Sequence, residues 1–255
     1  MYIGRICAAA AFLSVAAAAF GEGDHGGRDF SVTAGAGAVL GGSFTRYSLS
    51  ADGSLARVEA EQNVDQFDYG LFAFLDATYG TLSVHVQNGT NSFAEPVKTN
   101  SPVDVSRSGQ GWETVLGFSL LVRYPFTPVD GLSVFPLLGM DYQASLVQMR
   151  TDSRGKVYDR SDGKEEWDRD LNAFRLSDWN SFHVRLGGGA EFMLSEKLSL
   201  RGDLLYGIRL MTPFEAKNLE RMKNLTGDDS PTLGGLSSGP SLRLGLGWRF
   251  LTLGR

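Results

Sequence analysis

Alternation of apolar and polar side chains in residues 239–250 constrains most strongly what this chain can fold into. Every second position is large and apolar, and Arg243 and Arg249 lie among small or polar residues between them. An extended strand places these two sets on opposite faces. Two arginines argue against burial of both faces, so one face suits hydrocarbon and the other a polar interior. The apolar set is Leu242, Leu244, Leu246, Trp248 and Phe250.

This segment resembles the C-terminal strand of bacterial outer-membrane β-barrel proteins. That strand carries an assembly signal made of a polar residue, a glycine two positions on, and two hydrophobic residues near the end. Arg243, Gly245, Trp248 and Phe250 match this pattern, although residues 251–255 follow the last aromatic residue. The resemblance implies that the barrel assembly machinery and periplasmic chaperones are partners.

The same alternation recurs along the chain and predicts eight strands, with long and short connections in turn. An even number of strands with short turns on one side and long loops on the other is typical of outer-membrane barrels. The predicted fold is therefore all-β, an eight-stranded antiparallel up-and-down transmembrane β-barrel with short periplasmic turns and long extracellular loops. The predicted strands are 29–46, 67–76, 82–87, 112–124, 132–144, 182–192, 198–210 and 239–250. The predicted long loops are 48–65, 88–110, 147–178 and 211–238.

The N-terminus has the pattern of a secretory signal. One basic residue, Arg5, precedes an apolar run that ends in small residues, which predicts a cleaved signal peptide over 1–20. A flexible leader over 21–28, a barrel over 29–250 and a tail over 251–255 follow. Cys7 is the single cysteine and lies in the signal, so we expect neither a disulfide nor a cysteine metal site, and no cofactor.

The types of charged residue indicate which face looks outward. All six lysines fall outside the predicted strands, whereas arginines and carboxylates share the polar face. The alternative is a soluble lipocalin-type barrel, in which the charged face would look outward into water. An enclosed interior instead favours arginine paired with carboxylate, and arginine facing mid-bilayer lipid would cost about 2–4 kcal/mol. The predicted lumen charge network is Asp29, Asp68, Asp76, Glu113, Arg123, Asp141, Arg185, Glu191, Arg201, Asp203, Arg209, Arg243 and Arg249.

Two ion pairs follow from the predicted topology. The last strand lies beside the first, which predicts a pair between Asp29 and Arg249. Glu191 and Arg201 flank the turn at 195–196 and are predicted to face each other.

Aromatic residues gather at the ends of the predicted strands, as the two interfacial belts of a membrane barrel require. The predicted periplasmic belt is Phe30, Tyr79, Tyr124, Phe192, Trp248 and Phe250, and the predicted outer belt is Phe67, Tyr69, Trp112, Tyr142, Trp179 and Phe182.

Candidate catalytic and metal-binding residues are sparse. His85 and His183 lie two residues from Ser83 and Ser181, which leaves an acylhydrolase conceivable, but we interpret both as hydrogen-bonded lumen histidines. The acidic run 159–170 lacks the spacing of a calcium loop. We therefore expect no catalytic residues and no metal site.

One helix is predicted within the last long loop. Thr212 suits the N-cap, Pro213 the first turn and Glu215 the third helical position, so the three form a capping-box pattern. Gly227 is placed to end the helix.

Composition and resemblance together narrow the function. A formal charge of −5 and a pI near 5.3 argue against nucleic acid as a partner. The architecture resembles the small barrels typified by OmpX, OmpW and the membrane domain of OmpA. That resemblance implies an outer-membrane location in contact with outer-membrane lipid, and an envelope-structural or surface-binding role for the extracellular loops. The alternative is a narrow channel for small solutes, lined by Phe72, Phe74, Leu121, Phe135 and Leu205.

Overall fold

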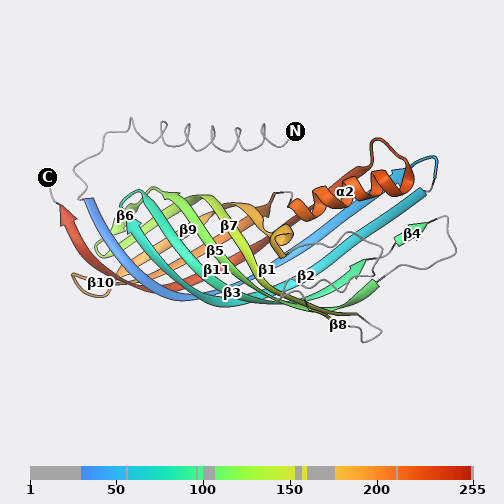
Figure 1. The fold of residues 1–255 in the computed structure, drawn as a ribbon. Coiled ribbons are helices and arrows are strands. Elements are labelled where there is room, and N and C mark those ends of the chain that lie inside the picture. Colours follow the sequence, from blue (N-terminus) through green and yellow to red (C-terminus); the bar gives the residue numbers. More distant parts are fainter. Residues whose placement is uncertain are drawn as a thin grey trace.

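Eight long antiparallel strands close into a barrel, which confirms the predicted fold class (Figure 1). The computed structural model describes residues 30–55, 57–95, 97–99, 107–152, 157–159, 176–210 and 212–253. The strands are β1 (Phe30–Asp52), β2 (Arg57–Ala77), β3 (Gly80–Glu95), β5 (Arg107–Arg123), β7 (Leu132–Asp152), β9 (Ser181–Met193), β10 (Leu198–Arg209) and β11 (Thr232–Leu253). Their order around the ring is β1-β11-β10-β9-β7-β5-β3-β2, and β2 pairs with β1 to close it. The predicted signal peptide, the leader and Asp29 lie outside the described residues.

The two faces of the barrel wall are those that the charge pattern predicted. Leu71 is 70% exposed and Leu204 is 61% exposed on the outside, whereas Asp76 and Asp141 are fully buried and Arg201 is 1% exposed. A wall that is apolar outside and polar inside suits lipid, because ring closure leaves no backbone hydrogen-bonding group unpaired in hydrocarbon. The lipocalin alternative is therefore wrong.

Glycines bring β1 and β11 close together where the barrel closes. Gly35 faces Gly247 and Gly37 faces Gly245 across the pair. A Cβ on Gly37 would collide with the Leu244 carbonyl oxygen, so this position requires glycine. The glycine of the assembly-signal pattern therefore also has a packing role in the closed barrel.

Strands occupy much of the sequence that was predicted to be loop. We use the name outer ribbon for residues 45–52 of β1 with residues 57–65 of β2, which form the paired outer ends of these two strands. At about 3.3 Å per residue, the eight residues on its β1 side span about 25 Å along the strand. Residues 232–237 of β11 pair with its β1 side. Of the predicted loop 48–65, only residues 53–55 are described outside the two strands, and Ala56 lies outside the described residues.

The face pattern inverts in the outer ribbon, which explains the error. Arg46, Ser48 and Ser50 point outward into water, and Ala51, Val58 and Val64 are buried on the inward face. The outward side chains of the outer ribbon are polar, so a search for strands with apolar outward faces assigns this segment to a loop.

The other predicted connections also gain structure. β3 continues to Glu95 and β5 begins at Arg107, so most of the loop 88–110 is strand, and β7 continues to Asp152 into the loop 147–178. β11 continues to Leu253, which pairs with Phe30, so the strand extends into the predicted tail 251–255. Short elements within the predicted loops and turns are β4 (Val97–Thr99), β6 (Phe126–Val129), β8 (Val157–Asp159) and the 3-10 helix η1 (Leu176–Trp179).

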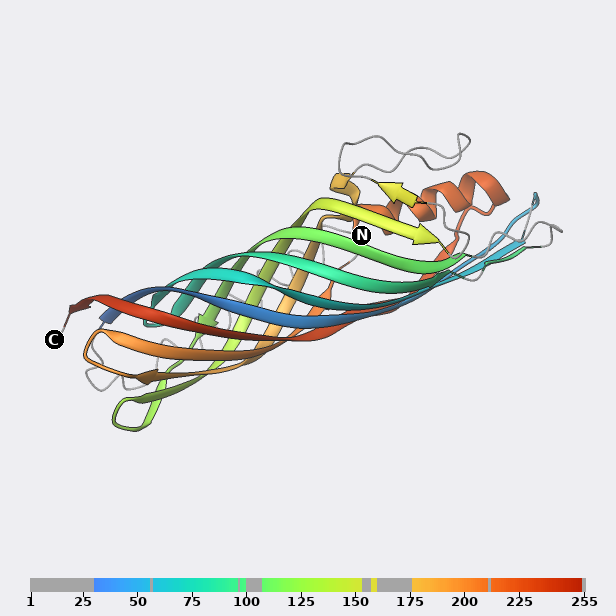
Figure 2. The ribbon, with the colours of Figure 1, turned by 90° about the horizontal axis from the view of Figure 1, so that it is seen from below.

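The predicted helix is confirmed as α2 (Pro213–Thr226). Thr212 and Glu215 form the capping box, and Gly227 ends the helix with φ 70°. Figure 1 shows α2 beside the outer ends of β1 and β2, opposite the end where a short turn joins β9 to β10, and Figure 2 shows the strands running obliquely around the barrel. Among the described residues, no helix is long and apolar enough to cross a membrane.

We expect a cysteine in α2 to be reachable from outside the cell. Glu220→Cys should react with a membrane-impermeant maleimide on intact cells, because Glu220 is exposed on the extracellular helix. Glu196→Cys, in the turn between β9 and β10, is the matched control and should react only after the outer membrane is permeabilised. If only Glu196→Cys were labelled on intact cells, the barrel would have the opposite orientation in the membrane.

Candidate functional site: the lumen and its outer cavity

Arginines and carboxylates form a buried layer across the periplasmic half of the lumen. We call this the lower layer, and it consists of Asp76, Arg123, Glu191, Arg201 and Asp203. Arg201 Nη1 pairs with Asp76, and Arg201 Nε donates to Asp203 Oδ1 at 2.9 Å. Arg123 Nη1 lies 3.1 Å from Asp76 Oδ2 and 3.7 Å from Glu191 Oε2. Since β10 and β2 are separated by β11 and β1, the pair between Arg201 and Asp76 crosses the lumen.

Aromatic rings cover the guanidinium planes of the lower layer. The Arg201 Cζ atom lies 4.9 Å from the ring centre of Phe74 and 5.4 Å from that of Phe135. Arg123 lies 5.0 Å from the same Phe135 ring. Stacking of this kind stabilises arginine, particularly where water is excluded.

A second arginine crosses the lumen at mid-height. Arg243 on β11 donates to Ser119 Oγ on β5 and to Ser83 Oγ on β3, both at 3.0 Å. β11 and β5 are separated by three strands in either direction, so Arg243 spans the barrel diameter. Ser119 donates on to Asp141, which accepts from Arg185 Nη2 at 2.7 Å. We call this set of side chains the middle layer.

The two specific ion pairs that the sequence predicted have different outcomes. Arg201 lies opposite Glu191 in the β9–β10 register, as expected. Its guanidinium nevertheless contacts Asp76 and Asp203, while Glu191 contacts Arg123, so the predicted pair is not among the ion pairs of the described residues. Asp29 is not described, and Arg249 Nη2 lies 3.1 Å from Met193 Sδ.

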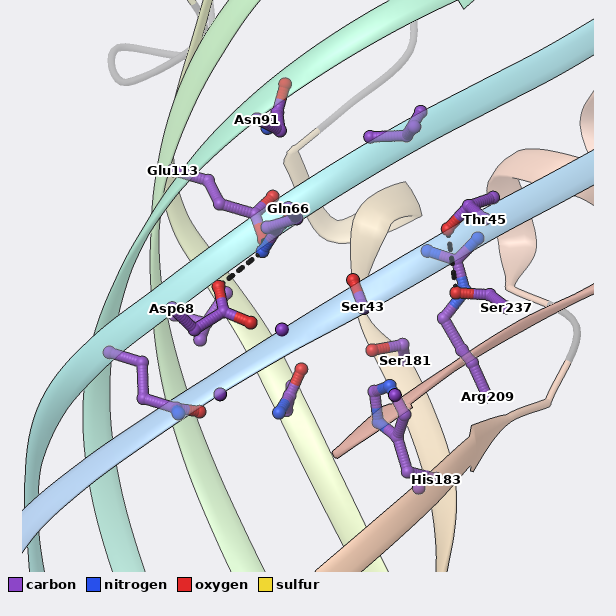
Figure 3. A pocket seen from close by; sticks show the side chains of 18 of the residues that line it. Ser43, Thr45, Gln66, Asp68, Asn91, Glu113, Ser181, His183, Arg209 and Ser237 are labelled. Carbon is purple, nitrogen blue, oxygen red and sulfur yellow. Dashed lines mark hydrogen bonds between the residues drawn. The ribbon is translucent and has the colours of Figure 1, made fainter. Parts of the chain in front are cut away.

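Above the middle layer lies a polar cavity of about 90 Å³. Figure 3 shows Gln66, Asp68 and Glu113 together on one side and His183 and Arg209 on the other. Gln66 Nε2 donates to Asp68 Oδ1 and to Glu113 Oε1, each at 2.6 Å. Amide and hydroxyl side chains form most of the remaining lining: Ser43, Thr45, Gln62, Gln87, Asn91, Gln143, Ser145, Gln148, Ser181, Ser237, Ser238 and Ser241.

The histidines do not form a catalytic pair with the nearby serines. Ser83 accepts a hydrogen bond from Arg243, and no hydrogen bond joins a serine to either histidine among the described residues. His85 lies 3.8 Å from Asp141, but neither of its ring nitrogens has a hydrogen-bond partner. The prediction that both histidines are hydrogen-bonded is therefore wrong for His85.

The helix α2 is tied to the cavity at one end and to the outer ribbon at the other. Arg209, a cavity residue, donates to Glu215 Oε1 at 2.7 Å. At the opposite end the Leu55 amide donates to the Thr226 carbonyl at 2.9 Å. The Asp228 carboxylate accepts from the amides of Ser230 and Asp52, which together lower its pKa. The helix is thus a fixed part of the mouth.

Some residues of the site were not predicted from the sequence. Gln66 and Asn91 are neutral, so a search for charges passed over them, and Glu215 was assigned only to the helix cap. Trp179 was predicted in the outer belt but lies on η1 and lines the cavity. Where the chain is described, no group of three or more His, Cys, Asp or Glu side chains is placed to hold a metal ion. Residues 160–170 of the acidic run are outside that part.

Comparison with known proteins identifies a family match across nearly the whole chain. Residues 6–250 match the outer membrane protein beta-barrel domain. Solved structures with similarity include the outer membrane protein OprG from Pseudomonas aeruginosa, with 12% identity over 88% of this chain and 97% of that chain and a TM-score of 0.40. The neisserial surface protein NspA has 12% identity over 84% and 99%, with a TM-score of 0.35. Ail from Yersinia pestis has 12% identity over 86% and 99%, with a TM-score of 0.30. No curated protein matches the sequence.

Proposed function

Because the chain belongs to the outer membrane protein β-barrel domain family, we propose that it is a non-conducting barrel that binds ligands at its extracellular end. It resides in the bacterial outer membrane, where its apolar outer face contacts lipid. The observation that carries the proposal is Arg243, whose guanidinium reaches from β11 to Ser119 on the opposite wall. An eight-stranded barrel has an interior just wide enough for side chains, so one such crossing leaves little room for a solute.

The lumen below Arg243 supports the same proposal. The lower layer adds a second crossing, and Arg201, Asp76 and Asp203 are each at most 1% exposed. A narrow apolar path is the competing hypothesis, but its residues are packed into two buried clusters. Phe72 and Phe74 pack with Val39, and Leu121, Phe135 and Leu205 pack with Leu137. Solute passage would therefore require both arginines to leave buried partners.

The extracellular end has the features of a binding surface. The outer ribbon and α2 form a supported platform around the mouth, and the cavity lining includes Thr45 and Gln62 of the outer ribbon and Ser237 of β11. The proposed role is non-enzymatic. The assembly machinery and periplasmic chaperones are the proposed folding partners, through Arg243, Gly245, Trp248 and Phe250.

Single-channel recording in planar lipid bilayers tests this proposal. The refolded protein should insert without discrete conductance steps in concentrated KCl. Arg243→Ala, which removes the side chain that spans the lumen, is the comparison variant. If either protein conducts ions, the conductance should be higher in this variant. Regular conductance steps in the unmodified protein would contradict the proposal and favour the narrow channel.

A further inference from the structure

We propose that the outer cavity binds an organic cation with several N–H donors, an ammonium or guanidinium group, between Asp68 and Glu113. This inference deepens the proposed function by naming the ligand class of the extracellular site. The ligand is either a small free amine or the basic side chain of an extracellular peptide, since both present the same group. The tests below separate the two sources.

One wall of the cavity carries acceptors without a cation. Asp68 and Glu113 both accept from the single amide nitrogen Gln66 Nε2, so their two oxygens lie within about 5 Å of each other. Two carboxylates this close repel each other unless a cation or a shared proton lies between them. Gln66 offers only the two protons of a neutral amide.

These two carboxylates are exceptions within the lumen. Asp76, Asp141, Glu191 and Asp203 each pair with an arginine, and at the mouth Glu215 pairs with Arg209. Among the described residues no ion pair involves Asp68 or Glu113. A fold that pairs its other described lumen carboxylates leaves these two without a cation on the wall of a cavity.

A second observation at the same wall is an unpartnered acceptor. Asn91 lines the cavity, is 7% exposed, and its Oδ1 atom has no hydrogen-bond partner. It lies directly opposite Gln66 in the β2–β3 register and opposite Gly111 in the β3–β5 register, two residues from Glu113. Two carboxylates that share one amide donor, and an amide oxygen that has none, thus lie on three adjacent strands. An ammonium would supply three N–H groups to them and a guanidinium five.

The far wall and the size of the cavity limit the ligand further. Arg185 and Arg209 on the opposite wall pair with Asp141 and Glu215, and neither makes an ion pair with Asp68 or Glu113 in the described part of the chain. A volume of about 90 Å³ equals about three water molecules. A cavity of this volume suits a cationic head group rather than a larger ligand.

Ligand-observed NMR on the full refolded chain in neutral detergent micelles tests the inference. At low ionic strength n-butylammonium and N-acetyl-lysine amide are the probes, and n-butanol is the neutral control. We expect the ammonium probes to bind and n-butanol not to bind. Binding of n-butylammonium would show that a free amine suffices, and binding of the lysine derivative alone would identify a peptide side chain as the source. Equal binding of n-butanol, or binding of neither ammonium probe, overturns the inference.

Variants locate the site. Asp68→Asn with Glu113→Gln keeps the side-chain shapes and should weaken ammonium binding at least tenfold. Glu61→Gln removes an exposed carboxylate from the same strand outside the cavity and should leave affinity within twofold. Equal ammonium affinity in the double variant and in Glu61→Gln would show that Asp68 and Glu113 do not form the binding site.

A further variant supplies the cation within the chain. In Gln66→Lys the ammonium of the new side chain can lie between the two carboxylates, so probe binding should be lost while the melting temperature rises. Unchanged probe binding in folded Gln66→Lys overturns the inference. The conductance of the barrel does not enter these measurements, so failure here and failure of the proposed function are distinguishable.

Discussion

Replacement of Arg201 by alanine should lower the free energy of unfolding by about 3 to 5 kcal/mol. Arg201 is the common partner of Asp76 and Asp203, and all three side chains are at most 1% exposed. The substitution leaves one carboxylate without a cation, and Asp76 retains only Arg123. It also removes the guanidinium that stacks between Phe74 and Phe135, so a cavity adds to the electrostatic loss.

Urea unfolding in detergent micelles, followed by circular dichroism, measures this loss. Arg46→Ala is the matched control, because Arg46 also pairs with an aspartate, Asp65, but both side chains are at least half exposed. An exposed pair contributes about 0 to 1 kcal/mol, so this variant should differ little from the unmodified protein. Equal losses in the two variants would show that the lower layer does not stabilise the barrel.

A double-mutant cycle distinguishes the observed partner from the predicted one. Asp76→Ala with Arg201→Ala should lose clearly less stability than the sum of the single losses, because each single change leaves the other charge buried. Coupling between Glu191 and Arg201 should be smaller, since their charged groups are not paired. A larger coupling energy between Glu191 and Arg201 than between Asp76 and Arg201 would instead support the pair that the strand register alone predicts.

The contrast between these pairs shows what the sequence could predict. Alternation placed Arg201 and Glu191 on the lumen face, and the short turn placed them opposite each other. The choice of partner depends on β2, which lies three positions away around the ring, and on side-chain reach across the lumen. Neither quantity is a local property of the sequence, so the faces were predictable and the pairs were not.

The extracellular end shows a different limit. The capping box of α2 is a local pattern of Thr212 and Glu215, and it was predicted correctly. The outer ribbon was missed because its outward face is polar and exposed and its inward face is buried, as Ala51 and Val58 are. Strand prediction based on lipid-facing alternation therefore ends where the membrane ends.

Gly37→Val should destabilise the barrel by about 3 kcal/mol or more, the upper end of the range for overpacking. The added Cβ would meet the Leu244 carbonyl oxygen and the Gly245 Cα, which are backbone atoms of the partner strand. Backbone atoms in a hydrogen-bonded ladder cannot turn aside as a side chain can, so relief requires β1 and β11 to separate. These are the strands that close the ring, and separation exposes unpaired backbone groups to lipid.

The shift of the folded band on a gel before and after heating, together with urea unfolding, measures this effect. Ala36→Val is the control, because it introduces the same side chain at the neighbouring position, which is exposed on the lipid face. Gly245→Ala should give an intermediate loss, since its Cβ would lie 2.9 Å from the Ala36 carbonyl oxygen and 3.1 Å from the Phe72 ring, and the ring can move. If Gly37→Val folds as well as Ala36→Val, close approach of the two backbones is not what holds the barrel closed.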